Sequence, residues 1–141
     1  MKYRAFSCLV ALTVVGALLS GCGVNPPVNS NKHLQELVEY GQTLEQVQGL
    51  MTDTLKARMT IYPAQELEKQ ANGSWTFKAM EGGEIGDTDA PFVVLVIKPD
   101  PTNTKYLTIF LQNGLVITTE WFSSTGAAII HKILGNLLDI Q

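Results

Sequence analysis

Cysteine and histidine are scarce in this 141-residue chain, and their scarcity narrows the chemistry open to it. The sequence contains two cysteines, Cys8 and Cys22, and two histidines, His33 and His131. The histidines stand far apart and form neither a His-x-x-x-His nor a His-x-His pair, so we expect no metal site and no other cofactor. The ten lysines and arginines do not cluster and the formal net charge is −3, which argues against a nucleic-acid partner.

The longest uncharged run stands at the N-terminus. Lys2 and Arg4 precede residues 5–19, which carry no charge and are almost all apolar or small. This pattern is typical of a secretory signal peptide, and the run is shorter than the roughly 20 apolar residues that span a bilayer. The sequence Leu-Ser-Gly-Cys follows at residues 19–22 and resembles the lipobox of bacterial lipoprotein precursors at all four positions.

The lipobox resemblance implies that residues 1–21 are removed and that Cys22 becomes the N-terminus, with S-diacylglycerol and N-palmitoyl chains attached. Buried acyl chains contribute about 0.8 kcal/mol per CH₂, so several chains anchor a protein lastingly in a membrane. Gly23 stands where aspartate favours inner-membrane retention of such lipoproteins. The expected location is therefore the cell outer membrane, facing the periplasm. The alternative is an ordinary secreted protein in which Cys22 follows the signal peptide by chance.

The chain beyond residue 21 predicts a single domain behind a short tether. Lys2 and Arg4 leave with the signal peptide, which takes the formal charge from −3 to −5. Removal of Cys8 and acylation of Cys22 leave no thiol for a disulfide. Residues 22–31 are rich in Pro, Asn and Ser and predict a flexible lipidated tether, followed by one domain over residues 32–141.

A helical hairpin is expected at the start of the domain. Residues 33–40 place two leucines and a valine at helical spacing, and Gly41 is expected to end that helix. Thr43 and Gln46 stand at the spacing of a capping box, which opens a second helix over the apolar stripe of residues 44–51.

The next segment is ambiguous, and a clear turn follows it. Residues 58–62 alternate weakly and could form a strand, whereas residues 63–70 could form a helix with Pro63 in its first turn. The Asn-Gly pair at residues 72–73 indicates a turn. Residues 74–79 then place Trp and Phe at alternate positions, which predicts a strand.

Two further regions carry strong strand signals. Residues 92–97 are a β-branched run of the kind found in strands buried on both faces. Residues 106–111 and 115–122 flank an Asn-Gly pair and predict a β-hairpin. A two-residue turn would place Tyr106 opposite Trp121, which gives the hairpin one aliphatic and one partly aromatic face.

Both faces of this sheet need cover, and the helical hairpin can supply only one layer. Residues 126–140 predict a C-terminal helix with an apolar stripe, capped by a serine or threonine among residues 123–125. This helix could fold back on the sheet or dock on a partner. The predicted fold class is α+β: a helical hairpin packed on a three- to four-stranded antiparallel sheet, with an additional C-terminal helix.

Large apolar side chains near the end of the hairpin and on the C-terminal helix are candidates for binding a partner, because aromatic anchors dominate interface hot spots. The alternative is that they pack inside the domain. The candidates are Tyr106, Trp121, Phe122, Ile130, Ile133 and Leu137.

Residues 80–91 hold three glycines and four acids and predict a solvated loop, with a calcium site as the alternative. The acids are Glu81, Glu84, Asp87 and Asp89. The loop does not have the spacing of an EF-hand or of a phosphate-binding loop. No catalytic constellation stands out in the sequence, so we expect a protein that is not an enzyme.

Three segments resemble small outer-membrane lipoproteins of the BamE/SmpA/OmlA type. Residues 41–51 are similar to their Gly-Met-Thr-x-x-x-Val-x-x-Leu-Leu stretch, residues 73–77 to their Trp-x-Tyr strand, and residues 106–116 to their closing hairpin. The resemblance spans roughly residues 32–122 and implies two helices on a three-stranded antiparallel sheet. The missing Gly-x-Pro after the second helix and the added C-terminal helix are departures.

The resemblance implies a lipid-anchored protein-interaction module that assists assembly or stability of an envelope complex through an envelope protein partner. The alternative function is an inhibitor or exclusion lipoprotein that binds a hydrolase such as lysozyme or a β-lactamase, since a charge of −5 suits a basic enzyme. A carrier of small molecules or lipid ranks third, because the chain has too few strands for a closed barrel.

Overall fold

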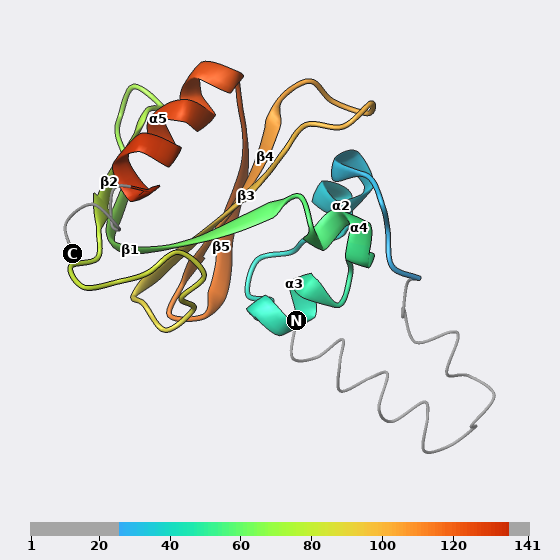
Figure 1. The fold of residues 1–141 in the computed structure, drawn as a ribbon, viewed down its shortest axis with the longest axis horizontal. Helices are drawn as coiled ribbons and strands as arrows, with labels where there is room; N and C mark the ends of the chain where they lie inside the picture. The colour runs from blue at the N-terminus through green and yellow to red at the C-terminus, as the bar shows by residue number, and fades with distance from the viewer. Residues whose placement is uncertain (1–25, 136–141) are drawn as a thin grey trace, which may run out of the picture.

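A five-stranded antiparallel sheet forms the centre of the molecule and separates two helical layers (Figure 1). The computed structural model describes residues 26–135, so the predicted signal peptide, Cys22 and Leu137 lie outside the described residues. The strand order is β2-β1-β3-β4-β5. The strands are β1 (Met59–Lys69), β2 (Trp75–Ala79), β3 (Phe92–Ile97), β4 (Tyr106–Gln112) and β5 (Leu115–Phe122).

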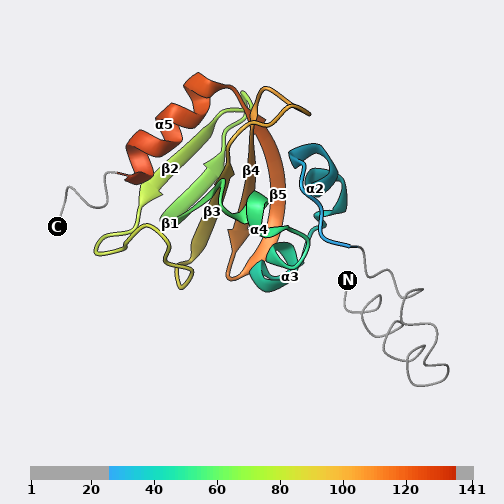
Figure 2. The same ribbon diagram turned by 45° about the vertical axis from the view of Figure 1, so that its right-hand side comes forward.

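Within residues 26–135, three short helices precede the sheet and one longer helix follows it. They are α2 (Asn31–Leu37), α3 (Leu44–Gln48), α4 (Asp53–Lys56) and α5 (Ser124–Gly135). Figure 2 shows α2, α3 and α4 on one side of the sheet and α5 on the other. The α+β class, the antiparallel sheet and the C-terminal helix are confirmed, whereas the sheet has five strands rather than three or four and the predicted hairpin of two helices is a set of three.

Side-chain caps fix where the helices before the sheet begin. The Thr43 hydroxyl accepts a hydrogen bond from the Gln46 N–H and the Gln46 side chain accepts one from the Thr43 N–H, so the predicted capping box is confirmed. The helix it opens ends after five residues, at Gln48. Thr52 then caps α4 by accepting from the Leu55 N–H, which starts a helix that the apolar pattern did not predict.

The helix predicted over residues 63–70 is wrong, because this segment completes β1. Pro63 pairs with Val93 of β3 in the observed register. The Ile61 carbonyl accepts from the Gly86 N–H, so the backbone groups of Ile61 point away from β3, and those of Pro63, two residues on, point the same way. The N–H that Pro63 lacks therefore faces the loop before β3 and costs the sheet no hydrogen bond.

The hairpin of β4 and β5 forms where it was predicted, with a different register. Asn113 and Gly114 both have positive φ, of 52° and 81°, as a tight hairpin turn requires. Leu111 pairs with Val116, but a bulge beside Phe110 shifts every later pair by one residue. Tyr106 therefore faces Phe122, and the predicted pairing of Tyr106 with Trp121 is wrong.

The two faces of the sheet have separate cores. The aliphatic face packs against α2, α3 and α4, and its buried members are Leu34, Val47, Met51, Leu55, Val93, Leu95, Ile97, Leu107, Ile109, Leu111 and Val116. The aromatic face packs against α5, and its buried members are Tyr62, Ala64, Leu67, Val94, Val96, Phe110, Ile130 and Leu134. α5 thus folds back on the sheet, and the Ser123 hydroxyl caps it by accepting from the Gly126 N–H.

Candidate functional site

The segment that leads from the predicted lipid anchor is bound to the domain from Val28 onward. The Val28 N–H donates to the Leu50 carbonyl at 2.8 Å, and the Thr52 N–H donates to the Val28 carbonyl at 3.1 Å. Val28 also forms a parallel bridge with Met51. The flexible tether expected over residues 22–31 therefore does not include its last four residues, because their backbone and side chains are hydrogen-bonded to the domain.

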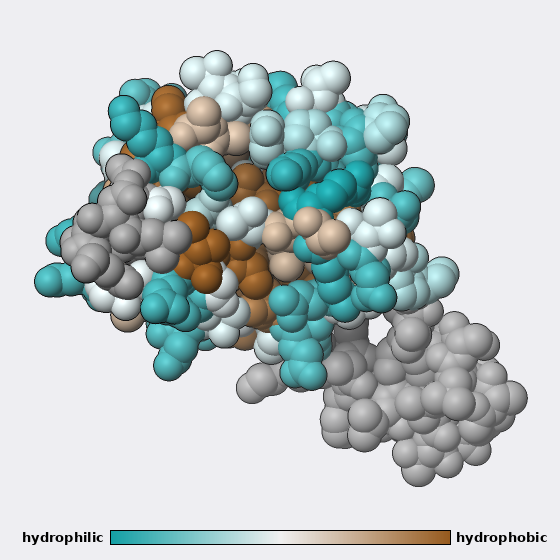
Figure 3. Space-filling model, in the orientation of Figure 1, coloured by the Kyte–Doolittle hydropathy of each residue, from teal (hydrophilic) through white to brown (hydrophobic). Residues whose placement is uncertain are grey.

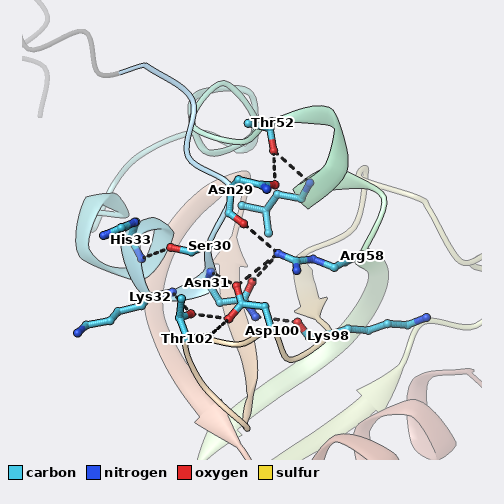
Figure 4. A network of polar contacts seen from close by, with 11 residues as sticks. Asn29, Ser30, Asn31, Lys32, His33, Thr52, Arg58, Lys98, Asp100 and Thr102 are labelled. Atoms are coloured by element: carbon cyan, nitrogen blue, oxygen red, sulfur yellow. Dashed lines mark hydrogen bonds and ion pairs between the residues drawn. The ribbon is translucent and has the colours of Figure 1, made fainter.

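Asn31 is the buried centre of this attachment (Figure 4). Its side-chain amide donates to the Lys98 carbonyl at 2.7 Å, and its backbone N–H donates to the Asp100 carboxylate at 2.7 Å. The Arg58 guanidinium donates to its side-chain oxygen at 3.3 Å. One residue of α2 thus joins the start of β1 to the loop between β3 and β4.

Asp100 carries the charge at the centre of the network. Its side chain is 2% exposed and lies 3.5 Å from Arg58 Nη2. Its carboxylate also accepts from the backbone N–H and the hydroxyl of Thr102. Burial raises the pKa of Asp100, but the hydrogen bonds from Thr102 and Asn31 and the charge of Arg58 outweigh that effect and hold the pKa below its ordinary value.

We call this network the anchor clamp, which consists of Asn29, Asn31, Arg58, Asp100 and Thr102. We call residues 28–31, which join the domain at its N-terminal side, the arm. Arg58 also donates to the Asn29 carbonyl at 3.3 Å, so its guanidinium is hydrogen-bonded to two residues of the arm at once. The carboxylate and the guanidinium are committed to structural hydrogen bonds, which suits them to fastening the arm rather than to proton transfer. The sequence signal that could have revealed the clamp is an Asp-x-Thr segment at residues 100–102.

The six predicted partner-binding residues do not share one surface. Tyr106 and Phe122 are half-buried on the aromatic face, whereas Trp121 packs on the aliphatic face, because consecutive side chains of β5 point to opposite faces and the bulge pairs Tyr106 with Phe122. Ile130 is 1% exposed and belongs to the core under α5, whereas Ile133 is 36% exposed on the outer side of that helix. Leu137 lies outside the described residues.

Apolar surface is exposed elsewhere. Figure 3 shows apolar residues gathered across the middle of one face, with a mostly polar rim. Among the described residues, the most exposed large apolar side chain is Tyr40, at 73%, and Leu115 is 45% exposed. Both line a hollow of about 270 Å³ at the turn of the β4–β5 hairpin. We call Tyr40 and Leu115 the hairpin-tip patch.

Backbone hydrogen bonds hold the two halves of the hairpin-tip patch together. The Gly41 N–H donates to the Val116 carbonyl, and the Val116 N–H donates to the Gln42 carbonyl, each at 2.8 Å. Gly41 has a φ of 85°, a left-handed conformation that lets the chain turn from Tyr40 toward α3. Exposed apolar residues that are fixed in place lose little freedom on binding, which suits them to contact a partner.

The acidic loop packs along β1. The Asp87 carboxylate accepts from the Glu84 N–H at 2.9 Å, which closes a turn within the loop. Among residues 26–135, no three or more His, Cys, Asp or Glu side chains are grouped to hold a metal ion. His33 is exposed in α2, and His131 contacts the hydroxyl of the buried Tyr62.

The fold and the clamp define an α+β domain with one antiparallel sheet between two helical layers. No family model, curated protein or solved structure matches this chain. Within the part that the structure describes, no helix has the length and apolar character needed to cross a bilayer.

Proposed function

We propose that this chain is a lipid-anchored protein-interaction module of the bacterial envelope, held by Cys22 in the outer membrane and facing the periplasm. The observation that carries the proposal is the Leu-Ser-Gly-Cys sequence at residues 19–22, six residues before the arm joins the domain at Val28. Six extended residues reach at most about 20 Å. The acylated cysteine would therefore hold the domain close to the membrane surface.

The anchor clamp supports this function by fixing where the arm leaves the domain. The arm leaves on the side of α2, α3 and α4, and α5 lies on the opposite face of the sheet (Figure 2). A domain held in this way would turn its α2–α4 side toward the membrane. Assembly or stabilisation of an envelope complex benefits from such a fixed orientation, because the partner then meets a pre-positioned surface.

The hairpin-tip patch is the surface that we propose for the envelope protein partner. Glu39 precedes Tyr40, and Glu45 lies in the first turn of α3, whose cap residue Thr43 bridges to Leu115. The apolar patch thus has acidic neighbours, which favour a partner with an apolar side chain framed by lysine or arginine.

Membrane attachment is tested by the fractionation of two cysteine variants. Wild-type protein in a Gram-negative host is expected in the membrane fraction, resistant to high salt and released by detergent. Cys22→Ala should move the protein to another fraction or leave it unprocessed, whereas the matched variant Cys8→Ala should behave as wild type. If Cys22→Ala fractionates with the membrane and is processed as wild type is, the anchor proposal is wrong.

The partner surface is tested by placing a photo-crosslinking amino acid at Tyr40 or Leu115 in cells. Both positions are expected to yield the same discrete adduct, and the exposed Lys105 serves as the control position. Adding Leu115→Glu to the chain that carries the probe at position 40 should abolish the adduct. The same adduct from position 105, or none from positions 40 and 115, would contradict the proposed surface.

A second candidate function is inhibition of a basic hydrolase such as lysozyme. The observation that favours it is the formal charge of −5 after residue 21, together with the acidic neighbours of the hairpin-tip patch. The unacylated Cys22→Ala protein should then slow lysozyme turnover, and added salt should relieve the effect. Unchanged turnover at micromolar protein would exclude this function for lysozyme.

A further inference from the structure

The aromatic face contains a cavity that neither the anchor clamp nor the hairpin-tip patch touches. It has a volume of about 220 Å³ and lies between the first two turns of α5 and the sheet. Val96 of β3 forms its apolar floor, and Ala127 and Ala128 of α5 line it from the other side. Ala127 is buried against the sheet, whereas Ala128 is exposed, so the cavity opens to solvent beside Ala128.

The cavity has one lysine and one histidine in its lining and no acidic side chain. The lysine is Lys98, which follows β3, and the histidine is His131 of α5. This contrasts with the net negative charge of the chain. The ring of His131 is held edge-on against Tyr62, with ring centroids 5.4 Å apart, and contacts the Tyr62 hydroxyl. His131 is exposed on α5, and its ring packs against the fully buried Tyr62.

Hydroxyl groups complete the lining. Tyr106 at the start of β4 and Ser124 at the start of α5 face the cavity. Thr108 pairs with Val96 across β3 and β4, so its side chain lies on the same side of the sheet, next to the cavity floor. The Thr108 hydroxyl is fully buried and has no hydrogen-bond partner among the described residues. Thr108 does not itself line the cavity, so this hydroxyl belongs to the sheet beside the cavity and not to its lining.

We propose that this cavity binds a small organic carboxylate with a compact apolar body. The carboxylate would form an ion pair with Lys98 and accept hydrogen bonds from His131, Tyr106 and Ser124, and the apolar body would rest on Val96 and Ala127. A charge-assisted hydrogen bond is stronger than a neutral one, so the acid is preferred over its neutral amide. The site is independent of the envelope function proposed above, because it lies on the other face of the sheet from the arm.

The test is a ¹⁹F NMR titration of the full chain with 4-fluorobenzoate, alongside 4-fluorobenzamide and competition by inorganic phosphate. The acid should bind saturably and the amide clearly more weakly, and phosphate should not displace the acid at equal concentration. Lys98→Gln should weaken binding roughly tenfold, the loss expected for one charge-assisted hydrogen bond. The matched control Lys105→Gln removes the same charge outside the cavity and should leave binding unchanged.

Ala128→Trp adds a second, steric test. Ala128 is exposed on α5, so this variant should fold as wild type by circular dichroism, and it should abolish binding by filling the cavity. The proposal is overturned if 4-fluorobenzoate does not bind, if the amide binds as tightly as the acid, or if folded Ala128→Trp binds as wild type does. Displacement by phosphate would show a general anion site and would also overturn the assignment to an organic acid.

Discussion

The two faces of the sheet are covered in different ways. The aliphatic face lies under three short helices, and the anchor clamp fastens the first of them, α2, to the loop between β3 and β4. The aromatic face lies under one helix, α5, which leaves a cavity of about 220 Å³ beneath its first two turns. The aliphatic face is therefore closed and held by polar contacts, whereas the aromatic face is less completely filled.

This difference assigns different roles to the two sides. The aliphatic side receives the arm from the predicted anchor, so on the proposed function its rigidity would fix the orientation of the domain. On the aromatic side, Phe110 lies at the centre of the aromatic contacts. The ring of Trp75 stacks on it with centroids 4.5 Å apart, and the ring of Phe122 meets it edge-on with centroids 6.3 Å apart. Deleting a buried side chain costs more where the neighbours are tightly packed and cannot relax, and less where space beside them lets them move into the gap. The following predictions test that contrast.

The largest effect is expected from truncating one fully buried leucine on each face. Leu34→Ala in α2 and Leu134→Ala in α5 should each lower the free energy of unfolding by about 2–5 kcal/mol, with Leu34→Ala at the upper end. α5 is a single helix beside a cavity and can shift to fill the gap, whereas α2 is held by the clamp. Urea unfolding measures both, and exposed Tyr40→Ala should change stability by less than about 0.5 kcal/mol. A larger loss of unfolding free energy for Leu134→Ala than for Leu34→Ala would contradict the proposed difference between the two faces.

A smaller loss, about 2 kcal/mol, is expected for Asp100→Asn at neutral pH, because the buried carboxylate loses charge-assisted hydrogen bonds. Folding lowers the pKa of Asp100, so its charged form stabilises the protein above the pKa of the unfolded chain, about 3.9. That stabilisation is lost as the pH falls through the lower pKa of the folded state. The stability gap between wild type and Asp100→Asn should therefore shrink below about pH 4.

The control for this pH dependence is Asp53→Asn. Asp53 is fully exposed and lies 3.9 Å from Lys56 in α4, so the variant should cost less than about 1 kcal/mol. Chemical denaturation at several pH values measures both proteins. If the difference in unfolding free energy between wild type and Asp100→Asn is the same at pH 7 and pH 3, the carboxylate is not the charged centre of the clamp.

Removal of one helix N-cap on each face should lower the free energy of unfolding by about 1 kcal/mol in each case. Thr43→Ala removes the capping box of α3, and Ser123→Ala removes the cap of α5, each a loss typical of a single N-cap. The Thr43 variant should also loosen the hairpin-tip patch, because Thr43 bridges to Leu115. Amide hydrogen exchange should then speed up at Gly41 and Val116 in Thr43→Ala and remain unchanged there in Ser123→Ala. Equal exchange rates in both variants would show that the cap of α3 does not stabilise the hairpin-tip patch.

The smallest effect concerns the unpaired hydroxyl on the aromatic face. Thr108→Val keeps the shape of the side chain and removes a buried polar atom that has no partner, so the change should be neutral or stabilising by up to about 1 kcal/mol. Thermal unfolding measures it. A loss of more than about 1 kcal/mol would mean that Thr108 is satisfied in solution, for instance by a water molecule.

Local signals in the sequence predicted much of this fold. The Asn-Gly turns, the capping box at Thr43, the strand over residues 92–97 and the C-terminal helix all depend on contacts within a few residues, and the structure confirms them. The bulge beside Phe110 and the strand conformation of Pro63 depend on neighbours across the sheet. Their local sequence gave no sign of either, so the hairpin register and the helix over residues 63–70 were predicted wrongly.

The anchor clamp was missed for the same reason. Asn31, Arg58 and Asp100 stand 27 to 69 residues apart in the chain, and only the folded sheet brings them together. The cavity under α5 likewise depends on two alanines meeting a lysine and a tyrosine from other elements. Neither set has a spacing that points to a function, whereas the resemblance of residues 19–22 to a lipobox is visible because the four residues are adjacent.

Anchoring through Cys22 is the central claim, and the mass of the mature N-terminus tests it most directly. Protein expressed with its full leader in a Gram-negative bacterium should be purified in detergent, digested and analysed by mass spectrometry. We predict an N-terminal peptide that begins at Cys22 and carries diacylglycerol and an additional acyl chain. A peptide that retains residues 1–21, or one that begins elsewhere without lipid, would contradict the account.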